Sequence, residues 1–449
     1  MAGKGPLLVF VAAPAAGHVN PLLRVASTLI KQGFEALFLS SPEFQDQITR
    51  AGAEWSPLEP FDFSCFSPAV IAALNVKMPC QLMAHAFEHI FVASIPRHTQ
   101  QLRKALEMLH RRDPARQVLV IHEFGAMAVH SFYFGSPLPE GYTSFPKTIC
   151  LGINPILFDS EVTGYAGPGL PFDDTPTGRA RNKYILELVH NFAYRALGDA
   201  HIQRLKETGC TSWPENFRLD DFCLTSDIFL QLCGPSFEYP DPTRSPKVRF
   251  IGTLPPKGVS PDLAYPSWWP EVTGAAGAGK QVVFVAQGTL DHAPERTLLP
   301  AIRAHQHRTD VIVVVAVGQR GGKLPDDFPV PVNTHVLDYF PYDAVLPYAD
   351  VFIFNAGYGG ASHAVGNGVP MVVLGELGQE KAEVAARIEY SGLGLVIRTP
   401  EPVVEEVKDA VERVLGDEKF KKKALELQKE SRELDPMAQI ERQIEEFTV

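Results

Sequence analysis

The 449-residue sequence contains no apolar run close to the roughly 20 residues that a membrane-spanning helix needs. It also contains no Asn-x-Ser/Thr glycosylation sequon. The apolar run at 7–16 is short and leads directly into a turn with Gly17 and Pro21, which favours a buried first strand over a secretory signal. We therefore expect a cytoplasmic protein without a transmembrane segment.

Positive charge and metal-binding spacings are also scarce. The formal net charge of -11 argues against a nucleic-acid partner, because proteins that bind nucleic acid carry a basic stripe. The six cysteines form no Cys-x-x-Cys or Cys/His pattern, which indicates reduced, structural thiols. No Asp-x-Asp triplet occurs, so we expect neither a metal nor another cofactor.

Short runs of Val, Ile, Leu and Phe recur between amphipathic stretches along the whole sequence. Such runs predict strands buried on both faces of a parallel sheet. They lie at 7–12, 35–40, 118–121 and 228–232 in the first half and at 282–286, 311–317, 351–354, 371–374 and 395–397 in the second. This alternation predicts an α/β protein of two doubly wound, parallel-sheet lobes.

The grouping of these runs also predicts the domain boundaries. Residues 1–240 form the first lobe and 281–418 the second, with a linker rich in Pro and Gly at 241–280. The segment 419–449 is predicted as a C-terminal helix that packs back on the first lobe. Residues 159–182, dominated by Gly, Pro and Asp, are typical of a mobile loop.

Three loops are candidates for a ligand site, because open α/β sheets bind ligands beyond the carboxyl ends of their strands. In the first, His18 lies near a helix N-terminus, which keeps a neutral imidazole available as a base; a capping or interface histidine fits equally well. In the second, 355–361, glycines let backbone N–H groups approach a pyrophosphate, although such glycines also serve packing. The third, 375–381, offers Glu380 for sugar hydroxyls or as a solvated acid.

Together these loops resemble the UDP-dependent glycosyltransferases of the GT-B fold, particularly the macrolide-type group and its fungal relatives. GHVNP at 17–21 is similar to the turn whose histidine deprotonates the acceptor. QGTL at 287–290, the stretch 335–360 that ends in NAGYGG, and GVPMVVLG at 368–375 follow the family's donor signature in order and spacing. The resemblance implies that the first lobe binds the acceptor and the second the UDP-sugar, across a central cleft.

The resemblance also implies which positions bind the nucleotide sugar: Gly17, Gln287, Gly288, Thr289, Tyr339, Phe340, Asn355, Gly357, Gly359, Gly360, Ala361, His363, Glu380 and Lys381. Asn355 replaces a phosphate-binding histidine, so more of the phosphate binding falls to backbone amides. His363 replaces the ribose-binding glutamate. In the family, an acidic residue followed by a glutamine binds the donor sugar. Glu380 keeps the acid of this pair, and Lys381 replaces the glutamine. The departure at His363 leaves ribose recognition open.

Relatives often place an aspartate behind the catalytic histidine, and Glu123 matches that position. Glu123 can orient His18 and stabilise its imidazolium; a strand that simply ends in solvent fits the sequence as well. The family implies inverting transfer of a hexose, with glucose as the default, to a hydroxyl of a small acceptor. The aromatic residues of 61–95 favour a lipophilic acceptor such as a phenol, flavonoid or polyketide, although core packing accounts for most of them equally well.

Two other classes of protein fit parts of this pattern. A GT-B epimerase would share the donor loop but would not need the GHVNP turn. A non-catalytic homologue, acting as the binding partner of another enzyme, fits the departures at Asn355 and His363. Release of UDP in the presence of phenols separates such a homologue from an enzyme.

Overall fold

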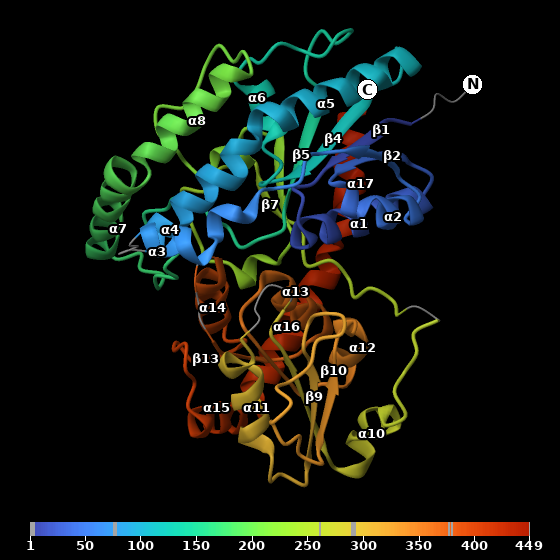
Figure 1. Cartoon of the computed structure of the whole chain (residues 1–449), viewed down its shortest axis with the longest axis vertical. Coiled ribbons are helices and arrows are strands. Elements are labelled where there is room, and N and C mark those ends of the chain that lie inside the picture. The colour runs from blue at the N-terminus through green and yellow to red at the C-terminus, as the bar shows by residue number, and fades with distance from the viewer. Residues whose placement is uncertain are drawn as a thin grey trace.

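The computed structural model describes residues 5–74, 79–259, 262–288, 293–375, 378 and 380–448. Two parallel β-sheets form two lobes, each with helices on both faces of its sheet (Figure 1). The predicted fold class is confirmed.

The first sheet is built around its most buried strand, β1 (Leu7–Val11), which pairs with β2 and β4. Its seven strands run in the order β3-β2-β1-β4-β5-β6-β7, all parallel. The other six strands are β2 (Glu35–Ser40), β3 (Glu54–Pro57), β4 (Val118–Glu123), β5 (Lys147–Gly152), β6 (Ile228–Gln231) and β7 (Val248–Phe250). The order reverses between β1 and β4, which is where open sheets bind ligands.

Helices cover both faces of this sheet. Leu22, Val25, Ala26 and Leu29 share one side of the first helix at helical spacing and are buried against the sheet. The helices of this lobe are α1 (Ala16–Lys31), α2 (Gln45–Arg50), α3 (Pro68–Leu74), α4 (Pro79–Ala86), α5 (Ala93–Arg112), α6 (Ala128–Tyr133), α7 (Pro176–Leu188), α8 (Arg195–Glu207) and α9 (Asp221–Leu224). Two π-helical turns, Phe87–Val92 and Val189–Ala193, join α4 to α5 and α7 to α8.

The second sheet repeats the arrangement, in the order β10-β9-β8-β11-β12-β13. Its strands are β8 (Gln281–Ala286), β9 (Val311–Ala316), β10 (Thr334–Leu337), β11 (Val351–Phe354), β12 (Met371–Val373) and β13 (Gly394–Val396). Helices α10 (Trp269–Thr273), α11 (Leu298–His305), α12 (Tyr342–Val345), α13 (Tyr358–Asn367), α14 (Glu380–Tyr390) and α15 (Val404–Gly416) surround it. The order reverses between β8 and β11, which makes this edge the second candidate ligand-binding position.

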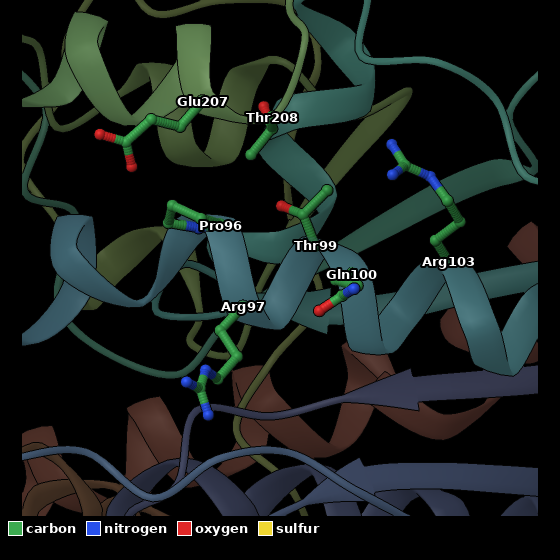
Figure 2. A pocket seen from close by; sticks show the side chains of 7 residues that line it. All are labelled: Pro96, Arg97, Thr99, Gln100, Arg103, Glu207 and Thr208. Atoms are coloured by element: carbon green, nitrogen blue, oxygen red, sulfur yellow. The ribbon is translucent and has the colours of Figure 1, made fainter.

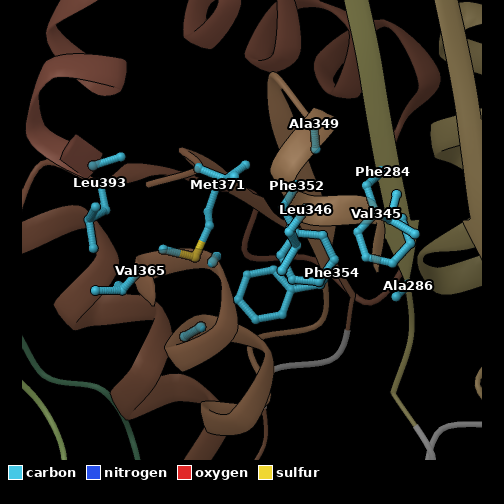
Figure 3. Packing of buried hydrophobic residues seen from close by; sticks show 14 of the residues in the cluster. Phe284, Ala286, Val345, Leu346, Ala349, Phe352, Phe354, Val365, Met371 and Leu393 are labelled. Carbon is cyan, nitrogen blue, oxygen red and sulfur yellow. The ribbon is translucent and has the colours of Figure 1, made fainter. Parts of the chain in front are cut away.

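A cluster of stacked aromatic rings lies beneath the first turn of α13. Phe352 stacks on Phe284 and Phe354, with ring centroids 5.0 and 4.6 Å apart (Figure 3). A Cβ on Gly360 would lie 3.0 Å from the Phe354 ring. Glycine at this position therefore lets the first turn of α13 lie directly on the core.

Residues 241–280, predicted as a linker, contribute to both lobes. They contain β7, the edge strand of the first sheet, so that sheet continues beyond the predicted boundary at residue 240. They also contain α10, whose Trp269 and Val272 lie in the core of the second lobe.

The C-terminal segment is two helices rather than the one predicted for 419–449. α16 (Glu418–Leu434) packs on the second lobe beside α13. The chain then turns at Asp435, whose φ of 49° is left-handed. α17 (Pro436–Phe447) packs beside α1, and Ile440 joins the core of the first lobe (Figure 1).

The segment 159–182, predicted as a mobile loop, is partly packed. Val162 and Tyr165 are buried in the first lobe, and α7 begins at Pro176. The amides of Gly167 and Gly169 donate to a carboxylate of the second lobe. Its composition gave no sign of these contacts, which come from distant residues.

Candidate active site

His18 and Glu123 lie at the carboxyl ends of β1 and β4, the first candidate ligand-binding position. His18 is in the first turn of α1, and Glu123 is the last residue of β4, directly beside β1. The His18 Nδ1 and Glu123 Oε2 atoms are 2.8 Å apart. The Glu123 side chain is fully buried and 16% of the His18 side chain is exposed. The alternative prediction that Glu123 simply ends its strand in solvent is therefore wrong. The alternative of a capping histidine is wrong as well, because Ala15 is the N-cap of α1.

Glu123 is held by three hydrogen bonds. Its Oε1 accepts from the Ala13 amide at 2.8 Å, and its Oε2 accepts from the Gly125 amide at 2.7 Å as well as from His18. Burial raises the pKa of Glu123, but His18 and these amides outweigh it and keep the pKa below its usual value. Glu123 is therefore ionised and can only accept, so Nδ1 of His18 carries a hydrogen and Nε2 keeps its lone pair.

The electrostatics of His18 differ from the sequence-based expectation. Burial lowers the pKa of His18, but the charge and hydrogen bond of Glu123, with a contribution from Glu380, raise it above 6.5. The helix terminus was expected to keep the ring neutral; the buried carboxylate decides the direction instead. His18 is thus a stronger base than a free imidazole.

Close packing fixes the imidazole ring. Its centroid lies 5.3 Å from the ring of Phe124 and 6.1 Å from that of Phe91, which belongs to the π-helical turn before α5. A Cβ on Gly125 would meet Cε1 of His18 at 3.0 Å and Cβ of Ala13 at 2.9 Å. Nothing in the sequence marked Gly125, whose role depends on this contact.

An apolar cavity adjoins the imidazole through Phe124. It is lined by Phe87, Phe124, the segment 152–158, and by Leu219, Cys223 and Phe229. Its free volume is about 20 Å³, enough for roughly one water molecule. The cavity must therefore widen before a larger molecule can enter.

A larger, polar cavity of about 360 Å³ lies elsewhere in the first lobe (Figure 2). Its lining comes from α5 and the end of α8, namely Pro96, Arg97, Thr99, Gln100, Arg103, Glu207 and Thr208. None of the candidate site residues lines it.

The glycine turn lies at the second ligand-binding position, between β11 and α13. Gly357 is the N-cap of α13, and a Cβ on Gly357 or Gly359 would meet nothing within 4 Å. The first amides of a helix have no partner within it, so this open terminus can take an anion. Ala356 before it has a left-handed φ of 59°, a strained conformation for a non-glycine residue that the sequence did not predict.

Asn355 joins the two loops of this lobe. Its side-chain Nδ2 donates to the carbonyl oxygen of Gln287, and both residues are buried. Asn355 therefore helps to hold the loop after β8. Gly288 follows with a φ of 77°, and Thr289 lies outside the described residues.

Other predicted donor-site residues differ in exposure. Tyr339 is exposed, and its ring lies 5.2 Å from the Arg320 guanidinium. Phe340 is buried in the core, where its ring packs against Trp269. Ala361 is also buried.

His363 is paired with a carboxylate that sequence reasoning missed. The His363 Nδ1 and Asp343 Oδ1 atoms are 2.7 Å apart, and Asn367 Nδ2 donates to the same oxygen. Asp343 is buried at the start of α12. Like Glu123 beside His18, the Asp343 carboxylate accepts a hydrogen bond from Nδ1 of His363, so Nε2 of that ring is left as the acceptor.

Glu380 and Lys381 begin α14, and both are partly buried. The carboxylate of Glu380 contributes to the raised pKa of His18, so the field of the second lobe reaches the candidate base. Gly17, one residue before that base, is exposed with open space at its Cβ position. Within the described part of the chain, no group of three His, Cys, Asp or Glu side chains is placed to hold a metal.

Known proteins match this chain over nearly its whole length. The C-terminal domain of the erythromycin biosynthesis protein CIII-like family matches residues 302–446. UDP-glucosyltransferase 1 of Beauveria bassiana (strain ARSEF 2860) is 34% identical over 444 residues, which cover 97% of this chain and 94% of that protein. UDP-glucosyltransferase B1 of Starmerella bombicola is 32% identical over 96% of each chain. The chain belongs to the UDP-glycosyltransferase family.

This UDP-glycosyltransferase also resembles solved structures. The glycotransferase of kitacinnamycin has a TM-score of 0.72 at 19% identity, with 99% of both chains covered. Spinosyn rhamnosyltransferase has a TM-score of 0.64 at 18% identity, covering 98% of this chain and 100% of its own. These likenesses support the GT-B fold.

Family membership decides between the classes that the sequence left open. This UDP-glycosyltransferase is an enzyme that transfers a glycosyl group from a UDP-sugar, so the epimerase and the non-catalytic homologue are set aside. Among the helices of the described residues, none is long and apolar enough to cross a membrane.

Proposed function

We propose that this enzyme transfers glucose from UDP-glucose, with inversion, to a hydroxyl of a small lipophilic acceptor, and that His18 is the general base. The observation that carries the proposal is the buried pair of His18 and Glu123 at the sheet position where ligands bind. The donor follows the names of the relatives, which are UDP-glucosyltransferases.

Proton transfer is the step assigned to this pair. Nε2 of His18 takes the proton of the acceptor hydroxyl as its oxygen attacks the anomeric carbon, and the bond from that carbon to the diphosphate breaks. Attack from the face opposite the leaving group inverts the anomeric carbon. Glu123 stays ionised, fixes the tautomer and stabilises the imidazolium that forms.

The leaving UDP gathers negative charge at the terminus of α13. Backbone amides at Gly359 and Gly360 are already oriented there, and the helix dipole favours the diphosphate. We propose that transfer needs no metal, and that it continues in excess EDTA at an unchanged rate. A loss of activity that Mg²⁺ or Mn²⁺ restores would contradict this part.

The acceptor is assigned to the apolar cavity beside His18. Aromatic and aliphatic side chains make up most of its lining, which suits a phenol, flavonoid or polyketide. Because its free volume is so small, acceptor binding must displace Phe87, Phe124 or the segment 152–158.

The base assignment is tested by His18→Ala. We expect kcat to fall by on the order of 10²- to 10⁴-fold, while the dissociation constant of UDP stays within about twofold, since only the proton acceptor is removed. His307→Ala, at an exposed histidine, is the matched control and should keep wild-type rates. Unchanged turnover in His18→Ala would remove the base assignment.

A mass-shift screen identifies both substrates. Wild-type enzyme is incubated with several UDP-sugars and a panel of phenols, flavonoids and polyketides, and the added mass identifies the sugar. NMR of the anomeric centre then reports the stereochemistry. A retained configuration would refute direct displacement.

A further inference from the structure

A buried ion cluster joins the two lobes next to the acceptor cavity. The Nε of Arg387 on α14 lies 2.7 Å from both carboxylate oxygens of Glu238, which follows β6 in the first lobe. Nη1 of Arg387 donates to Glu383, one turn earlier on α14, at 2.9 Å. The three side chains are each no more than 5% exposed.

This cluster holds the loop that lines the cavity. Nη2 of Arg387 donates to the carbonyl oxygen of Ile156, a cavity-lining residue, at 2.9 Å. Oε1 of Glu383 accepts from the amides of Gly167 and Gly169, at 2.8 and 2.9 Å. Both ends of the segment 156–169 are thus bound to α14.

The contact at Gly169 leaves no room for a side chain. A Cβ there would lie 2.4 Å from the carbonyl oxygen of Ala382, between Glu380 and Glu383 on α14. The loop backbone therefore lies directly against the helix whose first residue is Glu380.

We propose that Glu383 and Arg387 are positioning residues that hold the acceptor cavity in register with the donor-sugar acid Glu380. This inference rests on the proposed role of the cavity and on the sugar-binding role that the family resemblance implies for Glu380. Burying three charges carries a desolvation penalty that apolar side chains would avoid, so stability alone is a weak reason for the cluster. Precise placement is a stronger one, because a misplacement of about 1 Å at a reacting centre can lower a rate roughly 100-fold.

Two variants weaken the contact between the loop and α14 and keep the ion pair of Arg387 with Glu238. Gly169→Ala forces its methyl group against the Ala382 carbonyl. Glu383→Gln leaves one accepting oxygen in place of two, so either the amides of Gly167 and Gly169 or Nη1 of Arg387 lose their side-chain acceptor. Gly279→Ala is the matched control, because Gly279 has a φ of 66°, against 62° for Gly169, but nothing lies within 4 Å of its Cβ position. This control therefore reports the effect of a non-glycine residue at a left-handed φ, without a steric clash.

Kinetics on the best acceptor from the screen provide the first test. We expect Gly169→Ala and Glu383→Gln to raise the acceptor KM at least about tenfold, with the UDP dissociation constant within twofold of wild type and Gly279→Ala unchanged. A general loss of folding would weaken both substrates together. Acceptor KM values within twofold of the Gly279→Ala control in both variants would overturn the inference.

Hydrogen–deuterium exchange tests the same coupling without turnover. We expect UDP-glucose to slow exchange across 156–169 in wild type and in Gly279→Ala, but not in Gly169→Ala. Equal protection in all three proteins, or none in wild type, would refute the coupling. Absence of transfer to any acceptor would instead count against the proposed function, so the two failures are distinguishable.

Discussion

Replacing Glu123 with glutamine changes one atom of the catalytic pair that we propose, and the surrounding hydrogen bonds predict its effect. The carboxylate accepts three hydrogen bonds, one at Oε1 from Ala13 and two at Oε2 from Gly125 and His18. A glutamine amide has one accepting oxygen. Whichever way it turns, at least one of these donors faces an NH₂ group.

The two orientations of the amide have different consequences. With its oxygen toward His18, the buried Ala13 amide loses its partner, at a cost of about 1–3 kcal/mol in stability. With its NH₂ toward His18, the ring must accept at Nδ1, which moves the hydrogen to Nε2 and leaves no base. Both remove the charge that stabilises the imidazolium, so we expect kcat to fall by on the order of 10²- to 10⁴-fold.

The pH profile distinguishes this electrostatic role from simple damage. Since Glu123 raises the pKa of His18 above 6.5, the wild-type kcat/KM should fall on the acid side at a pH above 6.5. In Glu123→Gln, burial lowers the pKa of His18 and only the weaker contribution of Glu380 opposes it. The acid limb of the pH profile should therefore move to lower pH.

Ser226→Ala is the control for Glu123→Gln, because it removes the hydrogen-bond partner of the neighbouring buried His122 and leaves the pair intact. Its acid limb should match that of wild type. A Glu123→Gln enzyme with kcat within about threefold of wild type, and an unshifted acid limb, would refute the reasoning.

Three further predictions follow from neighbouring contacts. Gly125→Ala should lower kcat by roughly tenfold or more with little change in UDP affinity, because its methyl group would displace the imidazole; initial rates and UDP titration check this. Asp343→Asn should raise the KM for UDP-glucose several-fold at a nearly constant kcat, since the tautomer of His363 is no longer fixed; an unchanged KM would exclude a ribose contact. The free energy of unfolding should decrease as the pH falls from 6.5 towards 4. Burial lowers the pKa of His130 and lowers that of His201 to about 4. Below pH 6.5 the unfolded chain therefore binds protons that the folded protein does not. Each histidine contributes at most about 1.4 kcal/mol of stability per pH unit. His201→Leu tests this, because neither ring nitrogen of His201 has a hydrogen-bond partner among the described residues. The urea midpoint of this variant should change less with pH than that of wild type.

The central strands of both sheets were predictable because both of their faces are buried. The runs at 7–12, 282–286 and 351–354 are continuously apolar for that reason. The partly exposed strands β3, β7 and β10 lack such a run and were not predicted. The missed strand β5 is buried, but it begins with Lys and Thr and carries less apolar signal.

The break in the C-terminal segment, which was predicted as one helix, has a signal in the sequence. Asp435 and Pro436 form a helix stop followed by a helix start, because proline is favoured in the first turn and aspartate at the N-cap. Phe340 had no such signal. An aromatic residue in a binding motif is buried or exposed according to what packs on it, and here Trp269 from the predicted linker does so.

The sequence by itself determined the fold class, the family and the loops of the candidate site, because buried strands and motifs at strand ends are local patterns. Tertiary structure alone decided the ionisation of the candidate site. The pKa of His18 depends on Glu123, 105 positions away, and the cluster of Glu238, Glu383 and Arg387 joins residues up to 149 positions apart. Charges act through space and burial, and neither can be read from neighbours in the chain.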